Sequence, residues 1–170
     1  YRRSYEIDDP AERRRRGLAP ATAAVESDVP SDADDIRLAL TVSTPADQIA
    51  VAPGRIERTW IEGERRFTHF SEPRMRNYFA IAAARYASKT RSWNGRTIEL
   101  HYDPAHSANA EAALDIAARA LEDCERNFGP YRPAQLRMAE VPSYWPFGAL
   151  AMPNTVFLTE HRTLLIDRRD

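Results

Sequence analysis

The most regular hydrophobic spacing in the chain lies between Ser107 and Phe128, where apolar residues recur at steps of three and four. Such spacing places them in one stripe along a helix. Ser107 or Asn109 can cap its start, because a short side-chain oxygen accepts from the free amides of the first turn. Gly129-Pro130 ends it, since Pro cannot continue a helix. The apolar stripe consists of Ala110, Ala113, Leu114, Ala117, Ala120, Leu121, Cys124 and Phe128.

Upstream of this helix the spacing changes to period two, which is typical of half-buried strands. Ile36 to Val42 alternates apolar and polar residues, and a short second strand is expected over 48–52. A hairpin closed through Glu62-Gly63 joins strands over 56–61 and 65–70, and 97–102 alternates again. Trp60, Phe67 and Phe70 are the bulky residues of the hairpin, and we interpret them as core aromatics.

Residues 75–90 have an ambiguous pattern, because the alanines at 80 and 82–84 favour a helix whereas Tyr78 to Ile81 is typical of a strand buried on both faces. We predict a strand, because Trp93-Asn94-Gly95 follows. Asn-Gly is a strong hairpin signal, since both turn positions need positive φ.

After the helix, strands are expected over 135–141 and 155–159, followed by a short apolar run over 164–166. The order of elements predicts an α+β fold that is mostly antiparallel β, with one long helix and further strands. We divide the chain into an irregular extension over 1–34, a β domain over 35–103 and the start of an α/β domain over 104–170. Arg13 to Arg16 follows three acids closely, so we interpret it as a self-paired helical turn.

Composition argues against several classes of function. Lys and Arg number 24 and Asp and Glu 25, so the chain has no strong field for nucleic acid. No stretch approaches the roughly 20 apolar residues of a membrane span, and the N-terminus does not resemble a signal peptide. Cys124 is the one cysteine, which excludes an intrachain disulfide, and its place on the stripe predicts a buried thiol. The start at Tyr1, without Met, indicates a piece of a longer protein.

The sequence contains few candidates for chemistry. His69, His101, His106 and His161 form no zinc-binding pattern, so we predict no metal site and no catalytic residue within the chain. Glu140, between Ala139 and Val141, is either a buried functional acid or, more simply, a carboxylate at a sheet edge. Glu160 and His161 are neighbours whose side chains are expected to point apart, which favours a surface or structural role.

Three segments after the helix resemble the aminopeptidase N family of zinc peptidases: NFGPY at 127–131, QLRMAEVP at 135–142 and GALAMPNTVFLTE at 148–160. Two upstream segments, TPADQIAVAPG at 44–54 and NYFAIAAARY at 77–86, are similar to a bacterial subgroup in which the peptidase-like region is joined to an ABC-transporter permease.

This resemblance implies that 35–103 closes an N-terminal β domain and that 104–170 begins a thermolysin-like catalytic domain in a bacterial inner-membrane parent. It further implies that 148–154 is an edge strand lining the substrate cleft, where an extended peptide would bind. Ala151 then stands where the family keeps the glutamate that holds the substrate's amino group, and a methyl group cannot pair an ammonium. The cleft-edge residues implied are Gly148, Ala149, Leu150, Ala151 and Met152.

By the same resemblance, the zinc-binding H-E-x-x-H helix would follow Asp170, so residues 1–170 should be catalytically silent. The strands after residue 135 would lack the cover of that helix, and Val156, Leu158 and 164–166 would form an apolar patch that favours self-association. Three alternatives remain: part of an active peptidase, a peptide- or protein-binding accessory module of a transporter, and a self-contained β-sandwich interaction domain. H-E-x-x-H in the segment after Asp170 would support the enzyme.

Overall fold

The computed structural model describes residues 7, 9–20 and 35–167, which fall into two units, Tyr1–Asp34 and Asp35–Asp170. In the first unit, α1 (Pro10–Arg15) begins after Asp9, whose carboxylate accepts hydrogen bonds from the amides of the first turn. Glu12 forms ion pairs with Arg15 and Arg16, so the self-paired helical turn is confirmed. The rest of the predicted extension, at 1–6, 8 and 21–34, lies outside the described residues.

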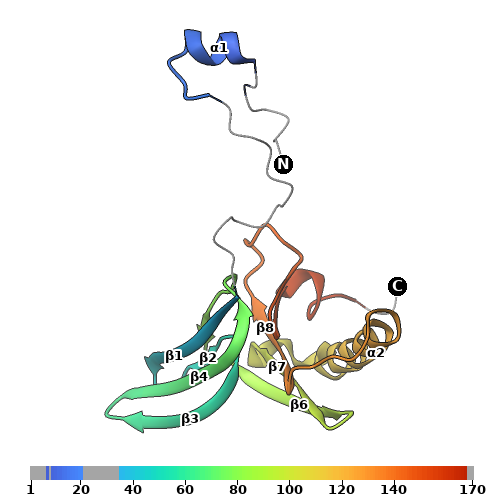
Figure 1. The fold of residues 1–170 in the computed structure, drawn as a ribbon. Coiled ribbons are helices and arrows are strands. Elements are labelled where there is room, and N and C mark those ends of the chain that lie inside the picture. Colours follow the sequence, from blue (N-terminus) through green and yellow to red (C-terminus); the bar gives the residue numbers. More distant parts are fainter. Residues whose placement is uncertain (1–6, 8, 21–34, 168–170) are drawn as a thin grey trace. The chain divides into compact units, whose positions relative to one another are not determined.

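In the second unit, the residues before 85 form two small antiparallel sheets (Figure 1). The first has the order β1-β4-β3, and the second pairs β2 with β5. Phe70 of β4 is fully buried, whereas Trp60 and Phe67 form a half-buried stacked pair, with ring centroids 5.2 Å apart. The strands are β1 (Asp35–Pro45), β2 (Ile49–Val51), β3 (Arg55–Glu62), β4 (Arg65–Arg76) and β5 (Ala82–Ala84).

The third sheet is mixed and has five strands in the order β6-β7-β8-β10-β9. The β6–β7 hairpin turns through Asn94 (φ 46°) and Gly95 (φ 73°), as the Asn-Gly signal predicts. β8 lies between β7 and β10 and is parallel to both, so the expected α+β arrangement is confirmed with a parallel centre. The strands are β6 (Ala87–Trp93), β7 (Arg96–Tyr102), β8 (Gln135–Val141), β9 (Ala149–Met152) and β10 (Thr155–Thr159).

The crossover from β7 to β8 contains η1 (Pro104–Asn109) and α2 (Ala110–Phe128), and α2 packs against β6 and β7 (Figure 1). Its stripe meets the apolar residues of β7, so the main core includes Leu114 and Leu121 from the helix and Ile98 and Leu100 from the strand. A second cluster covers the opposite face of the sheet, with Val51, Ala139, Val141 and Phe157.

Arg137 on β8 connects the five-stranded sheet to the segment before residue 85, which forms the two smaller sheets. Its guanidinium is 2% exposed and donates to the carbonyl oxygens of Ala52 (2.7 Å) and Gly54 (3.1 Å) and to Glu99 Oε2 (2.7 Å). The turn at Gly54 has φ +88°, and a Cβ there would lie 2.7 Å from the Ser71 carbonyl oxygen, so only glycine fits. The predicted division at residue 103 therefore falls inside one unit, in which β7 pairs with β8.

Two predictions about the long helix are wrong. Cys124 is exposed and Phe128 is 87% exposed, because the last turns of α2 extend past the residues that pack on the sheet. Asn109 occupies the N-cap position without capping, since its amide donates to the carbonyl oxygens of Leu164 and Ile166 (both 2.8 Å).

Two predictions about strands also need correction. Tyr78 (47% exposed) and Ile81 (45% exposed) lie outside any strand, because the three-residue β2 pairs only with 82–84 and leaves them without a partner strand. The apolar run 164–166 was expected to lie uncovered with the strands after residue 135, but Leu164 is buried in the main core. Val156 and Leu158 pack partly buried against that core, so much of the predicted apolar patch is covered.

No helix in the described part of the chain combines the length and apolar character that crossing a membrane needs.

Candidate functional site

The candidate site lies where the three parallel strands end. β7, β8 and β10 run in the same direction, so their carboxyl ends meet at one edge of the sheet. The residues around these ends are acidic or imidazole-bearing: Glu140 near the end of β8, His106 in η1 after β7, and Glu160 at the start of η2 (Glu160–Arg162) after β10. The carboxyl edge of parallel strands is where open α/β sheets bind ligands.

Glu140 is the centre of this group. Its side chain is only 4% exposed, and both carboxylate oxygens have partners. Oε1 lies 2.6 Å from Nδ1 of His106, and Oε2 accepts from the backbone amide of Asp103 at 2.6 Å. β8 is a central strand, so the interpretation of Glu140 as a carboxylate at a sheet edge is wrong and it is a buried acid. A buried carboxylate needs such compensation, because burial otherwise penalises its charge.

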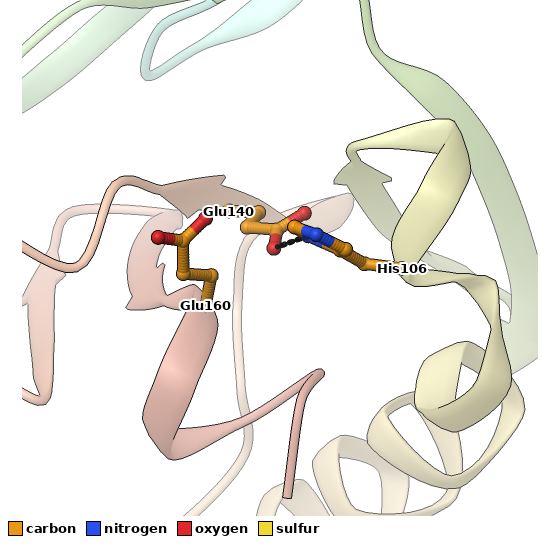
Figure 2. A group of neighbouring side chains, drawn as sticks. All are labelled: His106, Glu140 and Glu160. Carbon is orange, nitrogen blue, oxygen red and sulfur yellow. Dashed lines mark hydrogen bonds and ion pairs between the residues drawn. The ribbon is translucent and has the colours of Figure 1, made fainter.

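Glu160 completes the group from the other side. One ligand atom from each of His106, Glu140 and Glu160 can be chosen so that all three lie within 4.8 Å of one another. Figure 2 shows the three side chains extending from three different elements into one region. Glu160 Oε1 also accepts from the backbone amide of Ser143 at 3.0 Å, which orients its carboxylate.

The surrounding carboxylates favour the protonated form of the His106 imidazole. The hydrogen bond to Glu140 raises the pKa of His106 above its usual range against the opposing effect of burial, and the charges of Asp103 and Glu160 add to the increase. Hydrogen bonds from Ser143 lower the pKa of Glu160, with smaller contributions from His106 and His161. The imidazole therefore binds a proton more readily here than in water, and Glu160 stays ionised.

A pocket of about 760 Å³ opens beside these side chains. Asp103, Glu140 and Glu160 contribute its acidic lining, and Tyr86 and Trp145 are among its aromatic residues. The Tyr86 hydroxyl donates to the backbone carbonyl oxygen of Glu140 at 2.7 Å. Burial, together with the charge of Glu140, raises the pKa of Tyr86 to about 12, so the phenol remains neutral. The pocket is wide enough for a small ligand, and its lining includes Arg85 as well as the three acids.

The arrangement supports two kinds of chemistry. A carboxylate hydrogen-bonded to an imidazole can hold or pass a proton. An imidazole nitrogen with two carboxylates also provides donors for a divalent cation of the zinc or manganese type.

The sequence-predicted cleft edge lies close by along the chain. β9 forms the outer edge of the five-stranded sheet, paired only with β10, which leads into Glu160. Gly148 precedes β9, and a Cβ there would lie 2.9 Å from Cδ of Arg162. Leu150 and Met152 pack partly buried on the second apolar cluster, whereas Ala149 and Ala151 are exposed.

The sequence alone missed the triad, because its members are 34 and 20 residues apart along the chain and match no motif. One signal was available: a glutamate between the apolar residues Ala139 and Val141 of a strand. Two of the other histidines lie away from this group, and His161 directly follows Glu160. His101 is buried beside Ser88 and Glu99, His69 contacts Thr41, and His161 is exposed.

No protein-family model matches the chain, and no curated protein matches it in sequence.

Proposed function

We propose that this chain forms one wall of a peptide-binding cleft in an aminopeptidase N-like peptidase region, and that an extended peptide binds by adding a strand to β9. The observation that carries the proposal is the position of β9 at the free edge of the mixed sheet. Edge strands bind peptides through main-chain hydrogen bonds, which give affinity without any catalytic group.

The register of the β9–β10 hairpin identifies the groups available to a peptide. Met152 pairs with Thr155 and Leu150 with Phe157, and the Thr159 amide donates to the Gly148 carbonyl oxygen at 3.0 Å. These alternate positions bond to β10, so the main-chain groups of Ala149 and Ala151 point away from it, toward the free edge. Two amides and two carbonyls are therefore offered to an incoming strand, beside side chains no larger than methyl.

The resemblance to the transporter-linked subgroup supports a membrane-bound parent as part of this proposal. The two segments that carry that resemblance, 44–54 and 77–86, contain β2 and β5, which pair with each other. They are therefore one structural feature, next to the second apolar cluster on which Leu150 and Met152 pack. Under this proposal, the zinc of the resemblance is bound by a segment that follows Asp170.

A second candidate is a binding module of a transporter that has no peptidase activity. Ala151 favours it, because an exposed methyl group supplies no anion for a peptide amino group. Selection for free N-termini would then be weak, and the edge would accept an internal segment of a chain equally well.

The test is an NMR titration of the 170-residue chain with the acetylated, amidated peptide Lys-Thr-Val-Thr-Val-Thr-Lys. We expect the amides of Ala149 and Ala151 to shift and to exchange more slowly. Ala151→Pro removes one outward amide and should weaken binding about three- to tenfold, the worth of one hydrogen bond. Ala151→Val is the matched control, because it retains that amide. Shifts confined to other strands, or equal affinity of the two variants, would contradict strand addition.

A further inference from the structure

We propose that His106, Glu140 and Glu160 bind one divalent transition-metal ion of the zinc or manganese class at the carboxyl end of the parallel strands. The site would belong to the described residues themselves. It is therefore distinct from the zinc that the family resemblance implies, and it does not depend on peptide binding at β9.

The donors are of the right kind and come from independent elements. One imidazole nitrogen and two carboxylates suit Zn²⁺ or Mn²⁺ better than the all-oxygen ions Ca²⁺ and Mg²⁺. η1, β8 and η2 each contribute one donor (Figure 2). The two short helical turns directly follow strands of the same sheet, so its hydrogen bonding holds their starts in register.

The spacing is close to that of a bound site. Metal–ligand distances of about 2.0–2.2 Å place two donors of one tetrahedral ion about 3.4 Å apart. The donor atoms here lie within 4.8 Å of one another, and Nδ1 of His106 and Oε1 of Glu140 are 2.6 Å apart, so binding one ion requires these two to separate by about 1 Å and Glu160 to approach by about 1 Å. Glu160 can make its part of this movement, because it is partly exposed and its carboxylate is hydrogen-bonded to Ser143, which is itself exposed.

The negative charge of the group favours binding of a cation. Glu140 and Glu160 carry two negative charges, and Asp103 adds a third close enough to affect His106. Within residues 7, 9–20 and 35–167, neither Glu140 nor Glu160 forms an ion pair with a lysine or arginine. His106 is the basic group paired with Glu140, and a single imidazolium cannot neutralise three carboxylates. A divalent ion in place of the imidazole proton would reduce the excess from two negative charges to one.

The hydrogen bonds around the donors would support an ion. The Asp103 amide donates to Glu140 Oε2, which leaves Oε1 for the metal once the His106 proton has gone. The Ser143 amide donates to Glu160 Oε1, which leaves Oε2. Each carboxylate would thus have one oxygen oriented by the backbone and one free to coordinate, the usual arrangement around protein metals.

The test uses the 170-residue chain after treatment with EDTA and dialysis. Calorimetric titration with ZnCl₂ should give one ion per chain. The imidazole resonances of His106 should shift in a ¹H–¹⁵N spectrum while those of His69 and His101 do not. Co²⁺ in place of zinc should give visible absorption bands typical of four or five ligands, and Mg²⁺ should not compete.

Two variants decide whether these residues are the ligands. Glu160→Gln keeps an oxygen for the Ser143 amide and leaves the fold intact, yet it should weaken Zn²⁺ binding at least about tenfold. The matched control is His161→Gln, which removes an exposed imidazole from the next position and should change the affinity less than twofold. Absence of zinc binding to the unaltered chain would overturn the proposal, leaving an ion pair that only holds η1 to β8. Equal zinc affinity of Glu160→Gln and the unaltered chain would overturn it as well.

Discussion

Replacing Arg137 by methionine tests how the two parts of the 35–167 unit are held together. The change retains most of the aliphatic volume and removes the guanidinium that donates to Ala52, Gly54 and Glu99. The guanidinium carbon also lies 5.6 Å from the centre of the Phe70 ring, over its face. No solvent can replace these contacts, because Arg137 is 2% exposed.

The magnitude follows from what the variant leaves behind. Glu99, whose side chain is 21% exposed, would lose its arginine and keep only the more distant His101 at 3.6 Å, and removing one member of a buried pair costs about 3–5 kcal/mol. The Ala52 carbonyl oxygen would lose its guanidinium donor, whereas Gly54 would keep a bond from the Gln135 amide at 2.8 Å. We expect the free energy of unfolding to fall by about 3–5 kcal/mol, a large fraction of the stability of a typical domain.

Urea unfolding followed by circular dichroism measures the loss. The control is Arg91→Met, which removes an arginine on β6 paired with Asp115 and Glu111 of α2. That side chain is 34% exposed and Asp115 and Glu111 are more so, and such surface pairs contribute at most about 1 kcal/mol. Combining Arg137→Met with Glu99→Met should recover about 1–3 kcal/mol, because the unpaired carboxylate is then gone. If Arg137→Met cost no more than Arg91→Met, Arg137 would not be the link that the contacts indicate.

Two further predictions concern pH and association. Burial raises the pKa of Glu99, but His101 and Arg137 more than offset this and lower it to about 2. A carboxyl group whose pKa is lowered on folding stabilises the folded state at pH values above its unfolded pKa. The free energy of unfolding should therefore fall by about 2 kcal/mol, a figure reduced for the partial exposure of Glu99, as the pH is lowered from about 5 to about 2. Urea unfolding should show this decrease in the unaltered chain and much less in Glu99→Gln; equal decreases would contradict it. Ile116 and Ile166 are 53% and 44% exposed and line an apolar pocket of about 330 Å³. Exposed apolar surface of this kind favours self-association, so light scattering should show a dimer, and Ile116→Glu should convert it to a monomer. A monomeric unaltered chain would contradict this prediction.

Much of the local structure follows from residues close together in the sequence. The 3.6-residue spacing predicted the helix that spans 110–128, and alternation predicted β1, β7 and the β3–β4 hairpin. Asn94-Gly95 predicted the β6–β7 turn, because few other residue pairs adopt positive φ at both positions. These features depend on backbone preferences and on periods of two or 3.6, which a single segment displays by itself.

The sequence could not show which parts of each element would be covered. Cys124 continues the apolar stripe but lies beyond the sheet, and Tyr78 has a strand-like neighbourhood but no partner strand. Leu164 lies in a segment with no regular hydrophobic spacing and is nevertheless buried, because Asn109 at the start of the helix donates a hydrogen bond to its carbonyl oxygen. Burial depends on what packs against a residue, and that comes from distant segments.

The sequence by itself determined most of the elements and their order and the β6–β7 turn, together with the apolar character of β9, but not the irregular course of residues 78–81. Only the tertiary structure decided that β7, β8 and β10 are parallel, so that their ends bring His106, Glu140 and Glu160 within 4.8 Å. It also decided that β9 is an edge. The physical reason is that strand pairing is a choice among segments far apart in the chain, and no local preference specifies which of them will meet.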